Sequence, residues 1–164
     1  MAKVITLGEL LDAGVHFGHQ ASRWNPKMFP YIYAEQNGIH VIDLVQTARL
    51  LTHAYNYARK ASQEKKTFLF IGTKRQAAAI IAEEAQKCGG YFVNHRWLGG
   101  MLTNWGTISN SIKKLERLNI DLVSENRGFT KKELLKMSVQ RDKLQKSLGG
   151  ISQMKKIPDL IFVI

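Results

Sequence analysis

Cysteine and proline are scarce in this chain, whose 164 residues contain one Cys, at position 88, and three Pro. A single thiol cannot form a disulfide within the chain, so a fold held together by disulfides is excluded. No apolar run approaches the ~20 residues that a membrane helix needs, and the opening residues lack the pattern of a secretory signal. We therefore expect a soluble intracellular protein of a reducing compartment, with no membrane partner.

Acidic residues are also few. The chain has 13 Asp and Glu against 24 Lys and Arg, which gives a formal charge of +11. A balance this basic attracts polyanions such as nucleic acid. Hydrophobic residues make up 45% of the chain, enough for one packed core, and the length indicates a single main domain. The composition therefore favours a folded protein with an anionic partner.

Local patterns near the N-terminus predict a short helix and then a hairpin. Thr6 and Glu9 have the spacing of a capping box, which favours a helix over residues 7–13. Residues 31–34 and 39–42 have strand composition, and the Asn-Gly pair between them is typical of a tight hairpin turn.

A long helix is expected to begin after Asp43. The carboxylate of Asp43 can cap the first turn, with Gln46 completing a capping box three residues later. Apolar residues then recur at steps of four and three, and we expect the face that they form to pack on a sheet. The residues of this face are Leu44, Ala48, Leu51, Tyr55 and Ala58.

The middle of the chain predicts a strand, helix, strand unit, which is the unit that builds parallel sheets. Residues 67–71 and 91–93 have strand composition, and residues 75–88 between them have a helical apolar period. Residues 160–164 show a further buried-strand pattern. The face of the helix that we expect to be buried consists of Ala77, Ile81, Ala85 and Cys88.

Residues 104–156 predict a basic, antiparallel helical hairpin with a coiled-coil-like apolar seam. A turn at residues 126–128 separates the two helices, and Thr130 with Glu133 can cap the second. Residues 113–156 hold 12 Lys and Arg against 5 Asp and Glu, which places +7 of the total charge there. We expect an arm inserted into an α/β domain of residues 1–103 and 157–164. The seam consists of Ile108, Ile112, Leu115, Leu118 and Leu122 facing Leu134, Met137, Leu144 and Leu148.

Two short segments combine aromatic and basic residues without any carboxylate. They are GVHFGHQASRWNPKM, residues 14–28, and NHRWLGGMLTNW, residues 94–105. Indole rings can stack on bases, and Arg and Lys can pair with phosphates, so these segments suit RNA. The competing interpretations are that Trp24 and Trp97 belong to the core and that the basic helices are merely a solvated face.

Three other patterns suggest chemistry only weakly. Residues 72–74, Gly-Thr-Lys between strand and helix, resemble a phosphate-binding loop but lack its first glycine. His16 and His19 form one close pair, and with Cys88 and His95 they could suggest zinc, although structural zinc sites usually have two close pairs. We expect Cys88 to be a buried, inert thiol and predict neither a metal nor a cofactor.

Several sequence blocks together resemble one family, the small-subunit ribosomal protein S two of bacterial, cyanobacterial and plastid type. The blocks lie at residues 13–28, 70–78, 94–105, 147–151 and 158–164. The resemblance implies a flavodoxin-like, doubly wound parallel sheet with an inserted helical hairpin. Family members continue with further strand-helix units, so we expect the chain to lack the C-terminal part of the family domain.

This resemblance implies a structural constituent of the small ribosomal subunit that binds rRNA and neighbouring ribosomal proteins, including S one, and so supports translation. It implies no reaction and no small-molecule substrate, and it places the protein on ribosomes of a bacterial cytoplasm or a plastid stroma. The residues that we expect at RNA or protein contacts are Arg23, Trp24, Lys27, Arg96, Trp97 and Asn104, with Lys113, Lys114, Arg117, Lys131, Lys132 and Lys136 on the hairpin.

Two alternatives stay open at the level of sequence. A nucleotide-binding enzyme on a doubly wound sheet would use residues 72–74, which follow a strand at the edge where such folds bind ligands. A structural adaptor would instead use the basic hairpin to bind an acidic protein.

Overall fold

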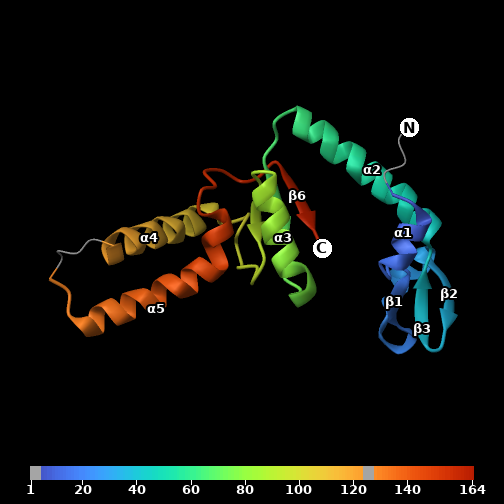
Figure 1. The fold of residues 1–164 in the computed structure, drawn as a ribbon, viewed down its shortest axis with the longest axis horizontal. Helices are drawn as coiled ribbons and strands as arrows, with labels where there is room; N and C mark the ends of the chain where they lie inside the picture. Colours follow the sequence, from blue (N-terminus) through green and yellow to red (C-terminus); the bar gives the residue numbers. More distant parts are fainter. Residues whose placement is uncertain (1–4, 124–127) are drawn as a thin grey trace. The chain divides into compact units, whose positions relative to one another are not determined.

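The computed structural model describes residues 5–123 and 128–164, and the chain divides into two compact units, Met1–Glu64 and Lys65–Ile164 (Figure 1). Each unit is described by itself. The predicted division into residues 1–103 with 157–164, and 104–156 as an insertion, stays a prediction.

The first unit contains a small antiparallel sheet in the order β1-β3-β2. Its elements are α1 (Leu7–Asp12), β1 (Phe17–Gln20), the 3-10 turns η1 (Ala21–Arg23) and η2 (Pro26–Tyr31), β2 (Ile32–Gln36), β3 (Ile39–Ile42) and α2 (Leu44–Gln63). The predicted capping box of Thr6 and Glu9 is confirmed. The predicted hairpin is confirmed as well, since Asn37 and Gly38 both have positive φ, 52° and 75°, as a two-residue turn of this kind requires.

One expectation for the start of α2 is wrong. The Asp43 carboxylate does accept hydrogen bonds from the backbone N–H groups of Val45 and Gln46, at 2.9 and 3.2 Å. The Gln46 side chain, however, donates to the Pro30 carbonyl oxygen at 3.1 Å instead of completing a capping box. Tyr55 on the expected apolar face is 50% exposed, and the packing of this face on a sheet stays a prediction. Periodicity identifies the residues that share a face but not the element that covers it.

The second unit is built on a parallel sheet in the order β5-β4-β6. Its elements are β4 (Phe68–Ile71), α3 (Arg75–Lys87), β5 (Tyr91–Val93), α4 (Trp105–Val123), α5 (Lys131–Leu148), the 3-10 turn η3 (Gly149–Ile151) and β6 (Leu160–Val163). The predicted strand, helix, strand unit is confirmed by β4, α3 and β5. The strand predicted near the C-terminus is present as β6, but its expected burial is wrong, because Val163 is 68% exposed.

The core of this unit lies between the sheet and the helices α4 and α5, which lie side by side (Figure 1). Four residues of the predicted stripe on α4 are buried, namely Ile108, Ile112, Leu115 and Leu118. In α5 the only buried residue is Leu148, while Leu134 is exposed. Thr130 and Glu133 form the predicted capping box of α5. Residues 126–127 of the predicted turn lie outside the described residues.

One polar contact joins the start of β4 to the start of β6 across 92 residues of sequence. The Asp159 carboxylate accepts hydrogen bonds from the Thr67 backbone N–H at 2.8 Å and from the Thr67 hydroxyl at 2.7 Å. The Asp159 N–H donates in return to the Thr67 carbonyl oxygen at 3.1 Å. The two hydrogen bonds from Thr67, helped by the charges of Lys156 and Lys66, hold the pKa of Asp159 below its ordinary value.

Two glycines permit close packing around the sheet. A Cβ on Gly72 would lie 2.5 Å from Cγ1 of Ile81, so glycine lets α3 approach the end of β4. A Cβ on Gly150 would collide with the carbonyl oxygen of Phe92 and lie 2.7 Å from Cδ2 of its ring. Glycine at position 150 therefore allows η3 to lie directly on β5.

We predict that D159N is less stable than the wild type at neutral pH, as measured by the urea midpoint. The pKa of Asp159 is lower in the folded state than in the unfolded state. The ionised group therefore stabilises the fold above the unfolded value of about 3.9, and this stabilisation is lost as the pH falls through the folded value. The difference in urea midpoint between D159N and the wild type should disappear at acidic pH. Equal midpoints at neutral pH would contradict the role of this contact, and E116Q, which changes an exposed carboxylate of α4, is the control.

We predict that G150A lowers the free energy of unfolding by about 2–3 kcal/mol, because the added methyl group must push η3 away from β5. Gly99 supplies the control, since its backbone is not in the positive-φ region and a Cβ there would meet no atom within 4 Å. G99A should change the urea midpoint little. The close approach of η3 to β5 is refuted if the two variants unfold alike.

Candidate nucleic-acid interface

The first aromatic–basic segment, residues 14–28, runs through β1, η1 and the start of η2. Trp24 is partly buried, and its ring meets His40 edge-on with a centroid separation of 4.8 Å. The flanking Arg23 and Lys27 are exposed. The Asn25 side chain fixes this arrangement by accepting a hydrogen bond from the Lys27 N–H at 3.0 Å. The ring thus anchors the segment, while two cations remain available to a partner.

The second segment, residues 94–105, follows β5. Trp97 and Trp105 are partly buried and pack against the core. This packing supports the interpretation that Trp97 belongs mainly to the core. Arg96, beside Trp97, is exposed and is the cation of this segment. Its planar guanidinium suits phosphate and base stacking.

Asn94 and Asn104 fix the two ends of the second segment. The Asn94 amide donates to the Ala78 carbonyl oxygen of α3 at 3.2 Å. The Asn104 side chain accepts from the Thr107 hydroxyl at 2.9 Å, at the start of α4. Asn104, which we predicted at an RNA or protein contact, therefore also has a structural role.

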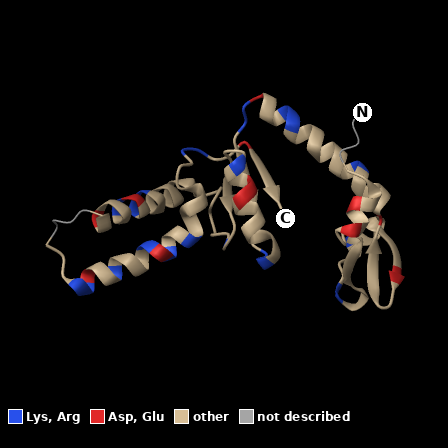
Figure 2. Ribbon diagram, viewed as in Figure 1, with Lys and Arg blue, Asp and Glu red and all other residues tan. Residues whose placement is uncertain are grey.

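The predicted basic residues of α4 and α5 are all exposed. They are Lys113, Lys114 and Arg117 on α4, and Lys131, Lys132 and Lys136 on α5. Figure 2 shows the Lys and Arg positions of the ribbon in blue. On α4 they lie on the side away from the buried stripe, so the charge is presented to solvent. The Glu133 carboxylate takes part in the capping box of α5. A hydrogen bond from the Thr130 backbone N–H holds the pKa of this carboxylate below its ordinary value.

The weaker chemical patterns have structural explanations. Gly72 is required by the close approach of Ile81, and the Lys74 side chain makes no capping hydrogen bond at the start of α3. The expected burial of Cys88 is wrong: α3 ends at Lys87, and Cys88 is exposed, with its Sγ donating to the Ala85 carbonyl oxygen at 3.3 Å. Within residues 5–123 and 128–164, no group of three or more His, Cys, Asp or Glu side chains is placed to hold a metal ion.

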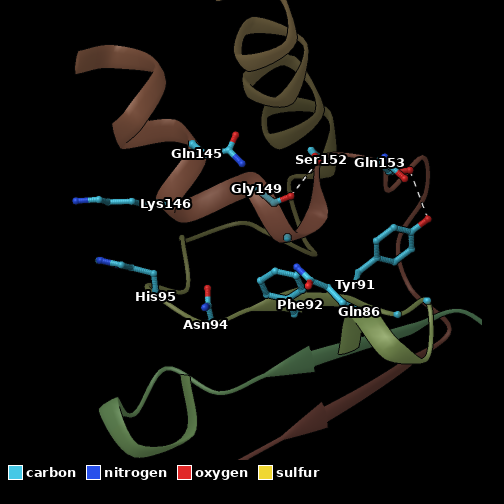
Figure 3. Close-up of a pocket in the computed structure, with 13 residues that line it drawn as sticks. Gln86, Tyr91, Phe92, Asn94, His95, Gln145, Lys146, Gly149, Ser152 and Gln153 are labelled. Atoms are coloured by element: carbon cyan, nitrogen blue, oxygen red, sulfur yellow. Dashed lines mark hydrogen bonds between the residues drawn. The ribbon is translucent and has the colours of Figure 1, made fainter. Parts of the chain in front are cut away.

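A cavity that the sequence did not reveal lies where α3 and α5 end, beside β5 (Figure 3). Its volume is about 560 Å³. Two Gly-Gly pairs, at residues 89–90 and 149–150, contribute backbone to its wall. These pairs were the only signal in the sequence, but they are 60 positions apart, and nothing local indicates that they meet.

A parallel α/β sheet beside two helices with exposed Lys and Arg side chains fits a nucleic-acid-binding protein. Among the described residues, no helix is long and apolar enough to cross a membrane. A family model described as Ribosomal protein S2 matches residues 10–164. The chain belongs to this ribosomal protein family.

Individual relatives agree with the family match. The chain is 63% identical to the small ribosomal subunit protein uS2c of Emiliania huxleyi, over 98% of this chain and 71% of the relative. It is 58% identical to the uS2c protein of Rhodomonas salina, over 98% and 67%. It is 56% identical to the uS2 protein of the cyanobacterium Acaryochloris marina, over 98% of this chain but 54% of the relative.

The different positions of Trp97 and Arg96 lead to a prediction. W97A should lower the free energy of unfolding by about 2–4 kcal/mol, because it leaves a cavity against the core. R96Q removes an exposed charge and should leave the urea midpoint within error while weakening binding to small-subunit rRNA in a filter assay. If W97A is as stable as the wild type and only RNA binding falls, the indole is primarily a contact surface.

Proposed function

We propose that this chain is a structural, non-enzymatic constituent of the small ribosomal subunit that binds rRNA and neighbouring ribosomal proteins. The observation that carries the proposal is the family match over residues 10–164, together with relatives named as small ribosomal subunit proteins. The alternative of a nucleotide-binding enzyme loses its support, because Gly72 is explained by helix packing and the family is structural.

The RNA contacts would come from three groups of residues. The first group belongs to the first aromatic–basic segment and consists of Arg23, Trp24 and Lys27. The second group belongs to the second segment and consists of Arg96, Trp97 and Asn104. The third group is Lys113, Lys114, Arg117, Lys131, Lys132 and Lys136 on α4 and α5. Every Lys and Arg in these groups is exposed, and phosphate contacts by such residues position a protein on RNA without reading its sequence.

We also propose that the second unit is part of a flavodoxin-like, doubly wound sheet, with α4 and α5 as an inserted arm. The strand order β5-β4-β6 is, in chain order, second-first-third, which is how the flavodoxin-like order begins. The chain between β5 and β6 contains α4 and α5, so their placement fits an insertion between two strands of the sheet.

By the same family resemblance, ribosomal protein S one is the proposed neighbour. The location that follows is the ribosome, in a bacterial cytoplasm or a plastid stroma. Relatives from algae and from cyanobacteria are both similar to the chain, which supports either setting.

The proposal predicts RNA binding that weakens steeply with salt. Each Lys or Arg that contacts a phosphate releases counterions, so the triple variant K113Q/K114Q/R117Q should lower the slope of log affinity against log salt by about 2. The measurement is filter binding to small-subunit rRNA over a salt series. R49Q/R59Q/K60Q is the matched control, because it removes three exposed charges from α2 and should change the slope less.

A sucrose gradient of cell extract tests the proposal in its natural setting. The native protein, detected by antibody, should travel with small subunits and be released by a high-salt wash. A protein that stays in the soluble fractions under both conditions, or an rRNA affinity that does not change with salt, would overturn the assignment.

A further inference from the structure

The cavity beside β5 is lined by both polar and apolar groups, and no carboxylate is among them. Four side-chain amides contribute to it, those of Gln86, Asn94, Gln145 and Gln153. Together, amide groups offer both hydrogen-bond donors and acceptors, the combination that reads the edges of nucleic-acid bases. The Tyr91 hydroxyl donates to the Gln153 carbonyl oxygen at 3.4 Å, which fastens one wall (Figure 3).

The cavity combines two kinds of electrostatic environment. The side chains of Lys146 and His95 extend to the same side at one end of it (Figure 3). The wall also contains the glycines that follow α3 and α5, so two helix C-termini meet there. The carbonyl oxygens of Gln86 and Gln145 already accept hydrogen bonds from the N–H groups of Gly89 and Gly149. The two helix ends therefore favour donors through their partial negative charge. A suitable ligand therefore has an anionic group at one end and N–H donors at the other.

We propose that this cavity binds one unpaired nucleotide of rRNA whose base carries an exocyclic amine. The base would enter between the helix ends, and its phosphate would lie at Lys146 and His95. The inference rests on the proposed function, because it names a particular RNA contact of the same protein. Asn94 and His95 of the second aromatic–basic segment line this cavity, but none of the individual residues that we predicted at RNA contacts does.

Size and chemistry select a single unpaired nucleotide. A volume of about 560 Å³ falls in the range of about 300–1,000 Å³ that encloses a small ligand and is too small for a duplex. Proteins read RNA sequence mainly at unpaired bases, which can leave the stack. The Asn94 amide N–H already donates to Ala78, which leaves its oxygen to accept from an amine. Adenine, cytosine and guanine have such an amine, whereas uracil has none.

Side-chain amide signals in NMR spectra give a direct test with the whole chain. Titration with tetracytidylate should shift the NH₂ signals of Gln145 and Gln153, and tetrauridylate should shift them less. K146Q should weaken tetracytidylate binding about fivefold, since one charge-assisted contact is lost. K143Q, an equal charge change on the same helix at a residue that does not line the cavity, should weaken it by less than about twofold.

The outcomes separate this inference from the proposed function. If tetracytidylate does not shift the NH₂ signals but the same protein binds small-subunit rRNA in a salt-sensitive way, the cavity site is overturned. The proposed function then still stands. Cytidine monophosphate that binds in the cavity while tetracytidylate does not would show a site for free nucleotide and overturn the RNA assignment. Equal shifts with tetrauridylate would overturn the placement of the amine. Failure to bind rRNA at all would overturn the proposed function itself.

Discussion

Parallel pairing of β4 on both of its edges is the constraint on which the second unit depends. β5 pairs with one edge and β6 with the other. The chain can reach those two positions only by crossing over, first through α3 and then through the segment that contains α4 and α5. Leu69 in β4 is 1% exposed, and the stripe of α4 completes the core around it. The basic helices are held on the sheet by this one apolar contact region.

Charge and burial are divided between the two faces of α4. Leu115 is 1% exposed, and its neighbour Lys114 is exposed. The helix thus packs on the core with one face and presents its charges to solvent with the other. One face could not do both, because buried charges would cost several kcal/mol each. α5 has a weaker division, with only Leu148 fully inside, so its attachment to the core lies mainly at its C-terminal end.

Expectations from the sequence were accurate where the interacting residues are close together in the chain. They failed where the outcome depends on segments that are far apart in the chain. The Thr6 and Thr130 capping boxes and the Asn37-Gly38 turn depend on residues within three positions of each other, and all three were predictable. The exposure of Tyr55 and Cys88 was not predictable, because periodicity says nothing about what covers a face or where a helix ends. The cavity was missed for the same reason: its walls come from segments that meet only after folding.

The contact between Thr67 and Asp159 has a consequence for synthesis. Its two residues are 92 positions apart, and at about 5–20 residues per second the second emerges roughly 5–20 s after the first. During that interval β4 is a nascent strand with one edge that no later strand can yet cover. Unpaired edges of this kind invite pairing with other chains. Protection of this edge by a chaperone would therefore matter most while the polypeptide is still being made.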